Sequence, residues 1–191
     1  KNLYLYGMKL SESIIMGIDP GTIKMGFAII KNAKPIPILL DYGTLNFRHL
    51  SDAHDKLHQI FIKIEQLTNK YAVNELAIEA PFYGKNVQSM LKLGRAQGVV
   101  ISAAKYFGLD TTEYSPRKIK QSVAGNGNAS KEQVARMIEK QFGVDLGEAG
   151  YDATDALSVA ICHAFSKRNI LIKNGSKNWD DFIKNNPDRI I

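Results

Sequence analysis

The sequence predicts an α/β protein built on a five-stranded mixed sheet with helices on both faces. The chain opens with three strand-like segments joined by turns, and it then alternates between helical and strand-like segments. Strands joined by tight turns pair antiparallel, whereas strands joined through a helix pair parallel. A length of 191 residues suits one compact domain with a real core.

The first two strands form a hairpin around a polar turn. Residues 14–18 are almost all apolar, which is typical of a strand buried on both faces. Pro20 and Gly21 interrupt this run, and residues 25–30 return as the second strand. Asp19 therefore stands at the end of a rigid strand, at the rim of the sheet, where water and ligands can reach it.

The turn that begins at Asp19 allows three interpretations. Asp-Pro-Gly is good turn chemistry on its own, because Pro presets φ, Gly accepts positive φ and Asp caps the turn. Asp19 could instead be a metal-binding carboxylate of a nuclease. In the third interpretation, residues 19–22 form a phosphate loop like those of the actin and sugar-kinase ATPases. Such ATPases use two duplicated lobes and a second phosphate loop, for which this chain is too short.

The rest of the chain completes the sheet and its helical layers. In chain order we predict strand 38–47, helix 52–71, strand 75–80, helix 87–107, strand 109–114, a short basic helix from 115, a helix after 130, and a last helix over 151–165. Ser51 and Asn86 are expected to be N-caps, and Ser130 with Gln133 forms a capping box.

Composition indicates a basic protein of a reducing compartment. The net charge of +6 makes an acidic partner plausible, and the 45% share of apolar residues is ordinary for a globular protein. The one cysteine, Cys162, permits no internal disulfide, and no apolar run reaches membrane-spanning length. We therefore expect a cytoplasmic protein that does not enter a membrane.

Four carboxylates stand in unusual positions. Glu79 ends an apolar strand two residues before Pro81, much as Asp19 ends one directly before Pro20. Asp152 and Asp155 are three residues apart on the largely apolar last helix, so they share one face. Unpaired carboxylates on such a helix are costly to desolvate unless a cation or water reaches them. The alternative for this pair is a favourable interaction with the helix dipole, because acidic residues are common in first turns.

The four carboxylates would meet if the two strands are parallel neighbours and the last helix crosses their ends. Without cations, such a cluster would repel and raise the pKa values of its members. Divalent cations relieve that repulsion, and ligands that are all oxygen favour Mg²⁺ or Mn²⁺ over zinc. Two such ions can activate water and stabilise the leaving oxygen of a phosphodiester. The pattern therefore favours metal-dependent cleavage of nucleic acid.

Four segments of the chain carry a family resemblance. They are Gly17–Thr22 (GIDPGT), Ala77–Phe82 (AIEAPF), Leu91–Gly98 (LKLGRAQG) and Asp152–Leu157 (DATDAL). In this order and at these intervals they resemble the RuvC family of Holliday-junction resolvases, in the ribonuclease H-like superfamily. The resemblance covers residues 14 to about 165. It implies that Asp19, Glu79, Asp152 and Asp155 are the catalytic, metal-binding acids; some relatives carry His at the last of these positions.

The resemblance also implies an activity and partners. A homodimer would nick two opposed strands of a four-way DNA junction, leaving ligatable 5′-phosphate ends, in homologous recombination and DNA repair. The implied cofactor is Mg²⁺, as two ions per active site that Mn²⁺ can replace. The implied protein partner is a branch-migration complex of the RuvA and RuvB kind. A non-catalytic junction-binding protein is the alternative; the loss of any one acid would have suggested it.

Basic residues near the acids are expected to hold DNA, because an acidic cluster repels phosphate. The candidates are Lys85, Lys92, Arg95, Arg117, Lys118, Lys120 and Lys131. Any one of them is ordinarily a solvated surface charge, but three of the four residues 117–120 are basic. The resemblance singles out Lys120 and Lys131 as positions that bind the DNA backbone near the active centre.

Two further features could serve the junction or the dimer. Phe82 is either a core residue or a wedge for a base unpaired at the crossover; the resemblance favours the wedge, and Tyr83 could share that work. Gly94 and Gly98 each cost about 0.5–1 kcal/mol relative to Ala inside a helix, so another backbone is expected to approach them. That backbone is either the chain's own sheet or, as the resemblance implies, the partner across a two-fold dimer interface.

We divide the chain into three parts. Residues 1–12 are expected to be a disordered or expression-derived leader, because residues 1–7 resemble a degenerate protease-cleavage linker. Residues 13–166 are expected to form the ribonuclease H-like nuclease domain. Residues 167–191 are polar, mixed in charge and weakly periodic, and we expect them to form a C-terminal tail.

Overall fold

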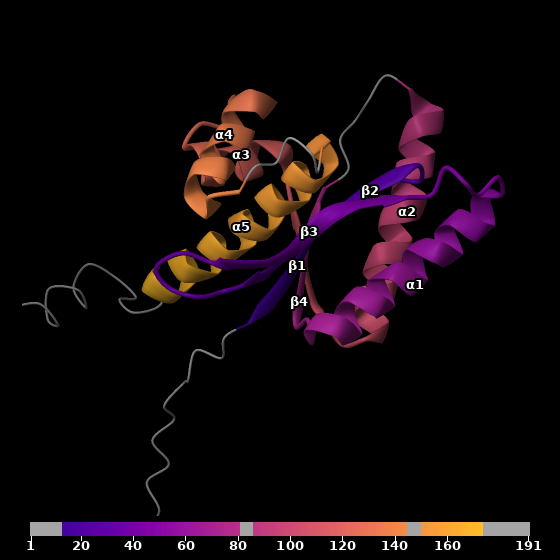
Figure 1. The fold of residues 1–191 in the computed structure, drawn as a ribbon, viewed down its shortest axis with the longest axis horizontal. Coiled ribbons are helices and arrows are strands. Elements are labelled where there is room, and N and C mark those ends of the chain that lie inside the picture. The colour runs from indigo at the N-terminus through magenta and orange to yellow at the C-terminus, as the bar shows by residue number, and fades with distance from the viewer. Residues whose placement is uncertain (1–12, 81–85, 145–149, 174–191) are drawn as a thin grey trace, which may run out of the picture.

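A five-stranded sheet in the order β3-β2-β1-β4-β5 forms the centre of the fold (Figure 1). The structure, a computed structural model, describes residues 13–80, 86–144 and 150–173. The strands are β1 (Ile14–Asp19), β2 (Lys24–Lys31), β3 (Ile38–Asn46), β4 (Glu75–Glu79) and β5 (Asp110–Tyr114). The first three pair antiparallel, and β4 and β5 run parallel to β1. The predicted mixed sheet is confirmed.

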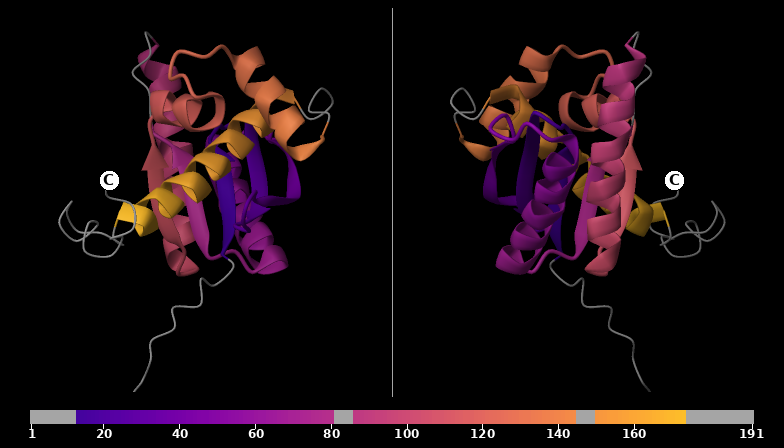
Figure 2. Two further views of the ribbon diagram at one scale, coloured as in Figure 1. Left: turned by 90° about the vertical axis from the view of Figure 1, so that its left-hand side faces the viewer. Right: turned by 90° about the vertical axis from the view of Figure 1, so that its right-hand side faces the viewer.

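Helices cover both faces of the sheet. One face carries α1 (Ala53–Tyr71) and α2 (Val87–Tyr106), and the other carries α3 (Pro116–Ala124), α4 (Lys131–Phe142) and α5 (Gly150–Lys173). Figure 2 shows α5 crossing the sheet in one view and α1 beside α2 in the other. In the described part of the chain, no helix is long and apolar enough to cross a membrane.

The continuous apolar run of β1 is explained by two separate cores. Side chains alternate between the faces of a strand, so neighbouring residues enter different layers. Met16 and Ile18 pack with the α1 and α2 side, whereas Ile15 packs with the α5 side, and all three are fully buried. β1 is therefore buried on both faces, as its sequence indicates.

The start of α1 corrects one predicted cap. Asp52, not Ser51, is the N-cap, and its Oδ1 accepts hydrogen bonds from the backbone N–H of His54 at 2.7 Å and of Asp55 at 3.0 Å. Ser and Asp are about equally good caps, so the sequence Ser-Asp allowed either start. The choice moves the helix start by one residue.

Side chains cap the helices nearest the candidate site as predicted. Asn86 caps α2 by accepting a hydrogen bond from the backbone N–H of Ser89 at 3.1 Å. Ser130 and Gln133 form a reciprocal capping box at the start of α4. These caps determine where Lys131, the first residue of α4, stands.

The last helix is longer than predicted, because α5 continues to Lys173 and not only to 165. Lys167 forms an ion pair with Glu75, with 2.7 Å between Nζ and Oε2. The guanidinium of Arg168 donates hydrogen bonds to the carbonyls of Ala33 and Pro35, in the turn after β2. These long-range contacts hold polar residues that look like a tail in the sequence. The predicted boundary at 166 therefore falls inside a helix.

Candidate active site

The ends of β1 and β4 bring two of the predicted acids to one edge of the sheet. The two strands are parallel neighbours, and Ile18 pairs with Ile78. Asp19 and Glu79 are the next residues on each strand, and both are the last residues of their strands. Because the carboxyl ends of parallel strands meet at the same edge, these side chains lie next to each other.

Two glycines let α5 lie directly on the strand backbones. A Cβ at Gly26 would stand 1.9 Å from the carbonyl oxygen of Asp152, and one at Gly17 would stand 2.2 Å from that of Ala156. Gly26 also pairs with Asp19 across the hairpin. The helix that carries the second pair of acids therefore contacts the strand next to Asp19. These contacts were not predicted from the sequence, although a glycine inside a strand is a known signal of close backbone approach.

The electrostatics of Asp19 show that the four carboxylates interact. Burial raises the pKa of Asp19 from its ordinary value of 3.8 to about 7, and the negative charges of Asp155, Glu79 and Asp152 add to the rise. The ammonium of Lys131 partly opposes it. Near neutral pH, the protonated and the charged forms of Asp19 are therefore both populated unless a cation binds to the cluster.

Glu79 has the same kind of environment. Burial and the charge of Asp155 raise its pKa, whereas the ammonium groups of Lys131 and Lys120 lower it. Both of these lysines were predicted to hold DNA near the acids, and both are close enough to Glu79 to influence its charge. They lie on α3 and α4, on the α5 side of the sheet.

Lys131 and Asp155 form a direct ion pair. Nζ of Lys131 donates a hydrogen bond to Oδ2 of Asp155 at 2.6 Å. This hydrogen bond raises the pKa of Lys131, and the nearby charges of Asp19 and Glu79 contribute as well. The lysine is therefore firmly cationic, and it occupies part of the coordination capacity of one acid.

The donor set fits a hard divalent cation. Four carboxyl groups supply only oxygen ligands, which suit Mg²⁺ or Mn²⁺. Burial is the main cause of the raised pKa of Asp19, the other three acids add to it by repulsion, and a cation would relieve that repulsion. Within the described ranges, no three His, Cys, Asp or Glu side chains already stand where they could share a metal ion. The acids are thus gathered near one another, and Asp155 is turned toward Lys131.

The other predicted DNA-binding residues lie in different places. Arg117 and Lys118 are exposed on α3, and Lys120 is half-buried. Phe82, Tyr83 and Lys85 lie outside the described residues, so their predicted roles as wedge and backbone contacts remain predictions. The catalytic and metal-binding roles of the four acids remain predictions too.

Gly94 and Gly98 do not touch the chain's own sheet. A Cβ at either position would meet no atom of the described residues within 4 Å, and both glycines are exposed on α2. The exposed apolar residues Val87 and Leu91 precede them on this helix. Packing within the chain is therefore excluded as the reason for these glycines, which leaves the dimer interface as the prediction for this face.

A buried glutamine behind Glu79 escaped the sequence analysis. The side-chain amide of Gln97, on α2, donates a hydrogen bond to the carboxylate of Glu113 at 3.0 Å and a longer one to the carbonyl of Glu79 at 3.4 Å. Gln97 is only 4% exposed. Gln97 and Gly98 are about 100° apart around α2, so one side of the helix contacts the strand that carries Glu79 and the adjoining side is exposed.

A second buried cluster anchors α5 at the far end of the sheet. His163 Nε2 and Glu75 Oε2 are 2.5 Å apart, and the hydroxyl of Tyr114 is 2.9 Å from His163 Nδ1. Burial alone would raise the pKa of Glu75, but hydrogen bonds from His163, Lys167 and Ser13 outweigh it and lower the pKa to about 2. We call the contact between His163 and Glu75 the clamp of α5. It depends on a charged carboxylate inside the core.

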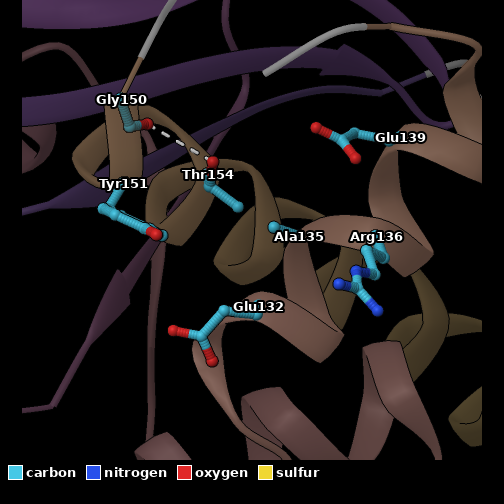
Figure 3. Close-up of a pocket in the computed structure, with 7 residues that line it drawn as sticks. All are labelled: Glu132, Ala135, Arg136, Glu139, Gly150, Tyr151 and Thr154. Atoms are coloured by element: carbon cyan, nitrogen blue, oxygen red, sulfur yellow. Dashed lines mark hydrogen bonds between the residues drawn. The ribbon is translucent and has the colours of Figure 1, made fainter. Parts of the chain in front are cut away.

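A pocket of about 320 Å³ lies between α4 and the first turn of α5 (Figure 3). Glu132, Arg136 and Glu139 line it from α4, and Tyr151 lines it from α5. None of the four candidate acids lines this pocket. It is therefore separate from the carboxylate cluster.

Comparison with known proteins identifies the family. Residues 15–163 match the family model described as crossover junction endodeoxyribonuclease RuvC. A relative of that name from Porphyromonas gingivalis is 44% identical over 96% of this chain and 100% of its own length. Another, from Cytophaga hutchinsonii, is 48% identical over 95% of this chain and 90% of its own.

Solved structures agree with the family match. Thermus thermophilus RuvC, solved in complex with Holliday junction substrate, superposes with a TM-score of 0.76 at 27% identity, covering 82% of this chain and 95% of that one. The yeast mitochondrial Holliday junction resolvase Ydc2 has a TM-score of 0.63 at 14% identity, covering 80% of this chain and 78% of its own, which shows the shared fold alone. The chain described here thus has a ribonuclease H-like fold and belongs to the RuvC family of crossover junction endodeoxyribonucleases.

Proposed function

We propose that this chain resolves four-way DNA junctions by paired, symmetric nicks that leave 5′-phosphate ends, in homologous recombination and DNA repair. The observation that carries the proposal is the gathering of Asp19, Glu79, Asp152 and Asp155 at one edge of the sheet. Membership of a family of crossover junction endonucleases supports the reaction class. The Thermus relative, solved with a Holliday junction substrate, supports junction DNA as the substrate.

The family consists of metal-dependent nucleases, and here Asp19, Glu79 and Asp152 would hold Mg²⁺, as two ions per site, with Asp155 as the fourth acid. The bound ions would supply an activated water and stabilise the charge on the leaving oxygen. The chain's own contribution is to hold the acids on the ends of β1 and β4 and on α5. These elements are in close backbone contact, which limits the movement of the acids. Mn²⁺ has similar ligand preferences and should substitute.

The lysines near the acids would hold the DNA strand that is cut. Lys120 and Lys131 influence the charge of Glu79, so they lie near the cluster that would otherwise repel phosphate. Lys131 would also keep Asp155 oriented through their ion pair. We further propose that Arg117, Lys118 and Lys85 contact the backbone more distantly, and that Phe82 and Tyr83 stack on bases at the crossover.

A homodimer would give two active sites for the two strands. The exposed face of α2, with Gly94, Gly98 and Leu91, supports close packing of two copies about a two-fold axis. A branch-migration complex of the RuvA and RuvB kind remains the proposed protein partner. A cytoplasmic location is proposed from the reduced cysteine and the DNA substrate.

A synthetic four-way junction tests the proposal directly. Each strand is labelled in turn at its 5′ end, and the products are mapped after incubation with Mg²⁺. We expect nicks at matching positions in two opposed strands, products that DNA ligase reseals, and no cutting of a linear duplex with the same sequence. Equal cutting of junction and duplex would contradict junction resolution, and binding without nicking would favour the non-catalytic alternative.

A further inference from the structure

A basic cleft lies on the face of the sheet opposite α5. Its volume is about 230 Å³, and its walls come from the turn between β1 and β2, the start of α1 and the first half of α2. The polar residues that line it are Thr22, Ser51, Lys56, Lys92 and Arg95. Figure 2 shows α1 and α2 together on this face, away from the helices that carry Lys120 and Lys131.

The cations of this cleft form no ion pair with a carboxylate of the described residues. In the part of the chain that the structure describes, no salt bridge involves Lys56, Lys92 or Arg95. Asp52 and Asp55, in the neighbouring first turn of α1, do not line the cleft, and the Asp52 carboxylate accepts backbone hydrogen bonds. Three cations that share a concave site without a counter-charge favour an anionic ligand.

The hydroxyl groups and the helix start suit a phosphate in particular. Thr22 and Ser51 offer O–H donors beside the cations, and the amino end of α1, a helix of 19 residues, contributes positive dipole potential. Charged donors bind phosphate oxygens more strongly than neutral ones, and arginine can do so with two parallel hydrogen bonds. Lys56 is half-buried and belongs to α1, so it stands apart from the exposed face of α2.

The cleft lies close enough to the acids along the chain to position a DNA strand over them. Thr22 is three residues from Asp19, on the same turn, so a phosphate held there would be fixed relative to the acidic cluster. The cleft lies on the α1 and α2 side of the sheet, whereas α5, which carries Asp152 and Asp155, packs on the other side. A DNA strand over the acids would thus meet cations on both sides, with Lys120 and Lys131 on one and the cleft on the other.

We propose that this cleft binds one backbone phosphate of the junction DNA, distinct from the phosphate that is cut. The proposal rests on the proposed function for its substrate. Backbone contacts of this kind set the register of a protein on DNA without reading its sequence. The cleft would therefore align the strand so that the scissile phosphate reaches the acids.

Lys56→Gln tests the proposal, with Lys34→Gln as the matched control. Both variants remove one positive charge, and Lys34 lies in the turn after β2, at the opposite end of the sheet. Binding to a four-way junction is measured in EDTA, so that the DNA stays intact, over a range of salt concentrations. Replacing a charged contact predicts about tenfold weaker binding for Lys56→Gln. The slope of log affinity against log salt should fall by about one. The control should leave both quantities unchanged.

A series of junctions identifies the phosphate, each with one neutral methylphosphonate. One substitution away from the cut site should weaken binding by the wild type and have no further effect on Lys56→Gln. Lys92→Gln and Arg95→Gln should lose sensitivity at the same position, and sedimentation should show an unchanged oligomeric state for both. If Lys56→Gln responds to every methylphosphonate as the wild type does, the cleft holds no DNA phosphate.

Two other outcomes are distinguishable. The variants are compared on whichever DNA the wild type binds best. If the wild type prefers linear duplex, that preference contradicts the proposed function, and the variants still test the cleft on the duplex. Inorganic phosphate or ATP that binds without DNA, with binding lost in Lys56→Gln, would assign the cleft to a free phosphate ligand and overturn the proposal. Unchanged melting temperatures check that the variants fold.

Discussion

Nζ of Lys131 lies 2.6 Å from Oδ2 of Asp155, and this ion pair joins the first residue of α4 to the first turns of α5. The two residues are 24 positions apart in the sequence. Their contact brings a cation to the edge of the cluster of four carboxylates. The same lysine opposes the rise in the pKa of Asp19 and of Glu79, so one ammonium group binds one acid and acts on the charge of two others.

Lys131→Gln should slow nicking while it leaves all four candidate acids in place. Loss of the ammonium raises the pKa of Asp19 further, because Lys131 opposes that rise. Loss of a charged hydrogen bond predicts a rate about ten- to a hundredfold lower at pH 7, with partial recovery at higher pH. Single-turnover cleavage of a junction measures this, with Lys140→Gln, in the last turn of the same helix, as the control. Equal rates for both variants would remove Lys131 from the site.

Asp19→Asn should separate binding from cutting. The amide keeps the shape of the side chain but removes the charge that would hold the metal, so nicking should fall by at least about a thousandfold while junction binding persists. Asp110→Asn, at the start of β5 and the far end of the sheet, is the matched control and should cut normally. Nicking at the wild-type rate by Asp19→Asn would exclude this residue from the mechanism.

The metal-free protein should lose stability as pH rises from about 4 to about 7. Asp19 has a pKa of about 7 in the folded chain against an ordinary value of 3.8, so the folded state binds more protons across this interval. The free energy of unfolding then decreases with rising pH, by up to about 4 kcal/mol. Thermal unfolding in EDTA measures the slope, which Asp19→Asn should flatten. Excess Mg²⁺ should restore stability at pH 7 and above, because it binds the charged, folded form.

Gly26→Ala should displace α5 from the strands. The new Cβ would stand 1.9 Å from the carbonyl oxygen of Asp152, a backbone atom that has no rotamer with which to avoid it. The expected loss is about 1–3 kcal/mol of stability, together with most of the nicking activity. Gly43→Ala, on β3, is the control, because its Cβ would meet only the Phe27 ring at 3.1 Å. Similar unfolding temperatures and activities for the two variants would contradict the assigned contact.

Gly98→Ala should affect the fold and the dimer in opposite directions. A Cβ at this position meets open space within the chain, so Ala should stabilise the isolated fold by about 0.5–1 kcal/mol through its helix propensity. If α2 packs closely against a second copy, the added methyl group should raise the dimer dissociation constant. Sedimentation measures the dimer, and unfolding at low protein concentration measures the fold. A dissociation constant equal to that of the wild type would place the interface elsewhere.

Local chemistry explains which parts of the site could be predicted. Apolar runs end in a carboxylate one or two residues before a proline at Asp19 and Glu79, and the strand order follows from the crossover helices. These features depend on residues that are neighbours in the chain. The sheet, its mixed direction and the edge at which the acids gather therefore agree with the prediction.

Contacts between distant elements explain what escaped prediction. The approach of Gly26 to Asp152 depends on how α5 crosses the sheet, which the sequence pattern does not define. The extension of α5 depends on Arg168 reaching carbonyls more than 130 residues away. Gln97 appears as an ordinary polar helix residue until the helix is placed against β4.

The clamp between His163 and Glu75 has a consequence for genetics. His163 is eight residues beyond Asp155, or about 12 Å along the same helix. Loss of either side chain leaves its buried partner with fewer hydrogen bonds, which costs about 1–3 kcal/mol of stability. A random screen for resolvase-deficient alleles should therefore recover changes at Glu75 and His163 as readily as some changes beside the scissile bond. Such alleles would be temperature-sensitive, whereas alleles of the acids would be deficient at every temperature.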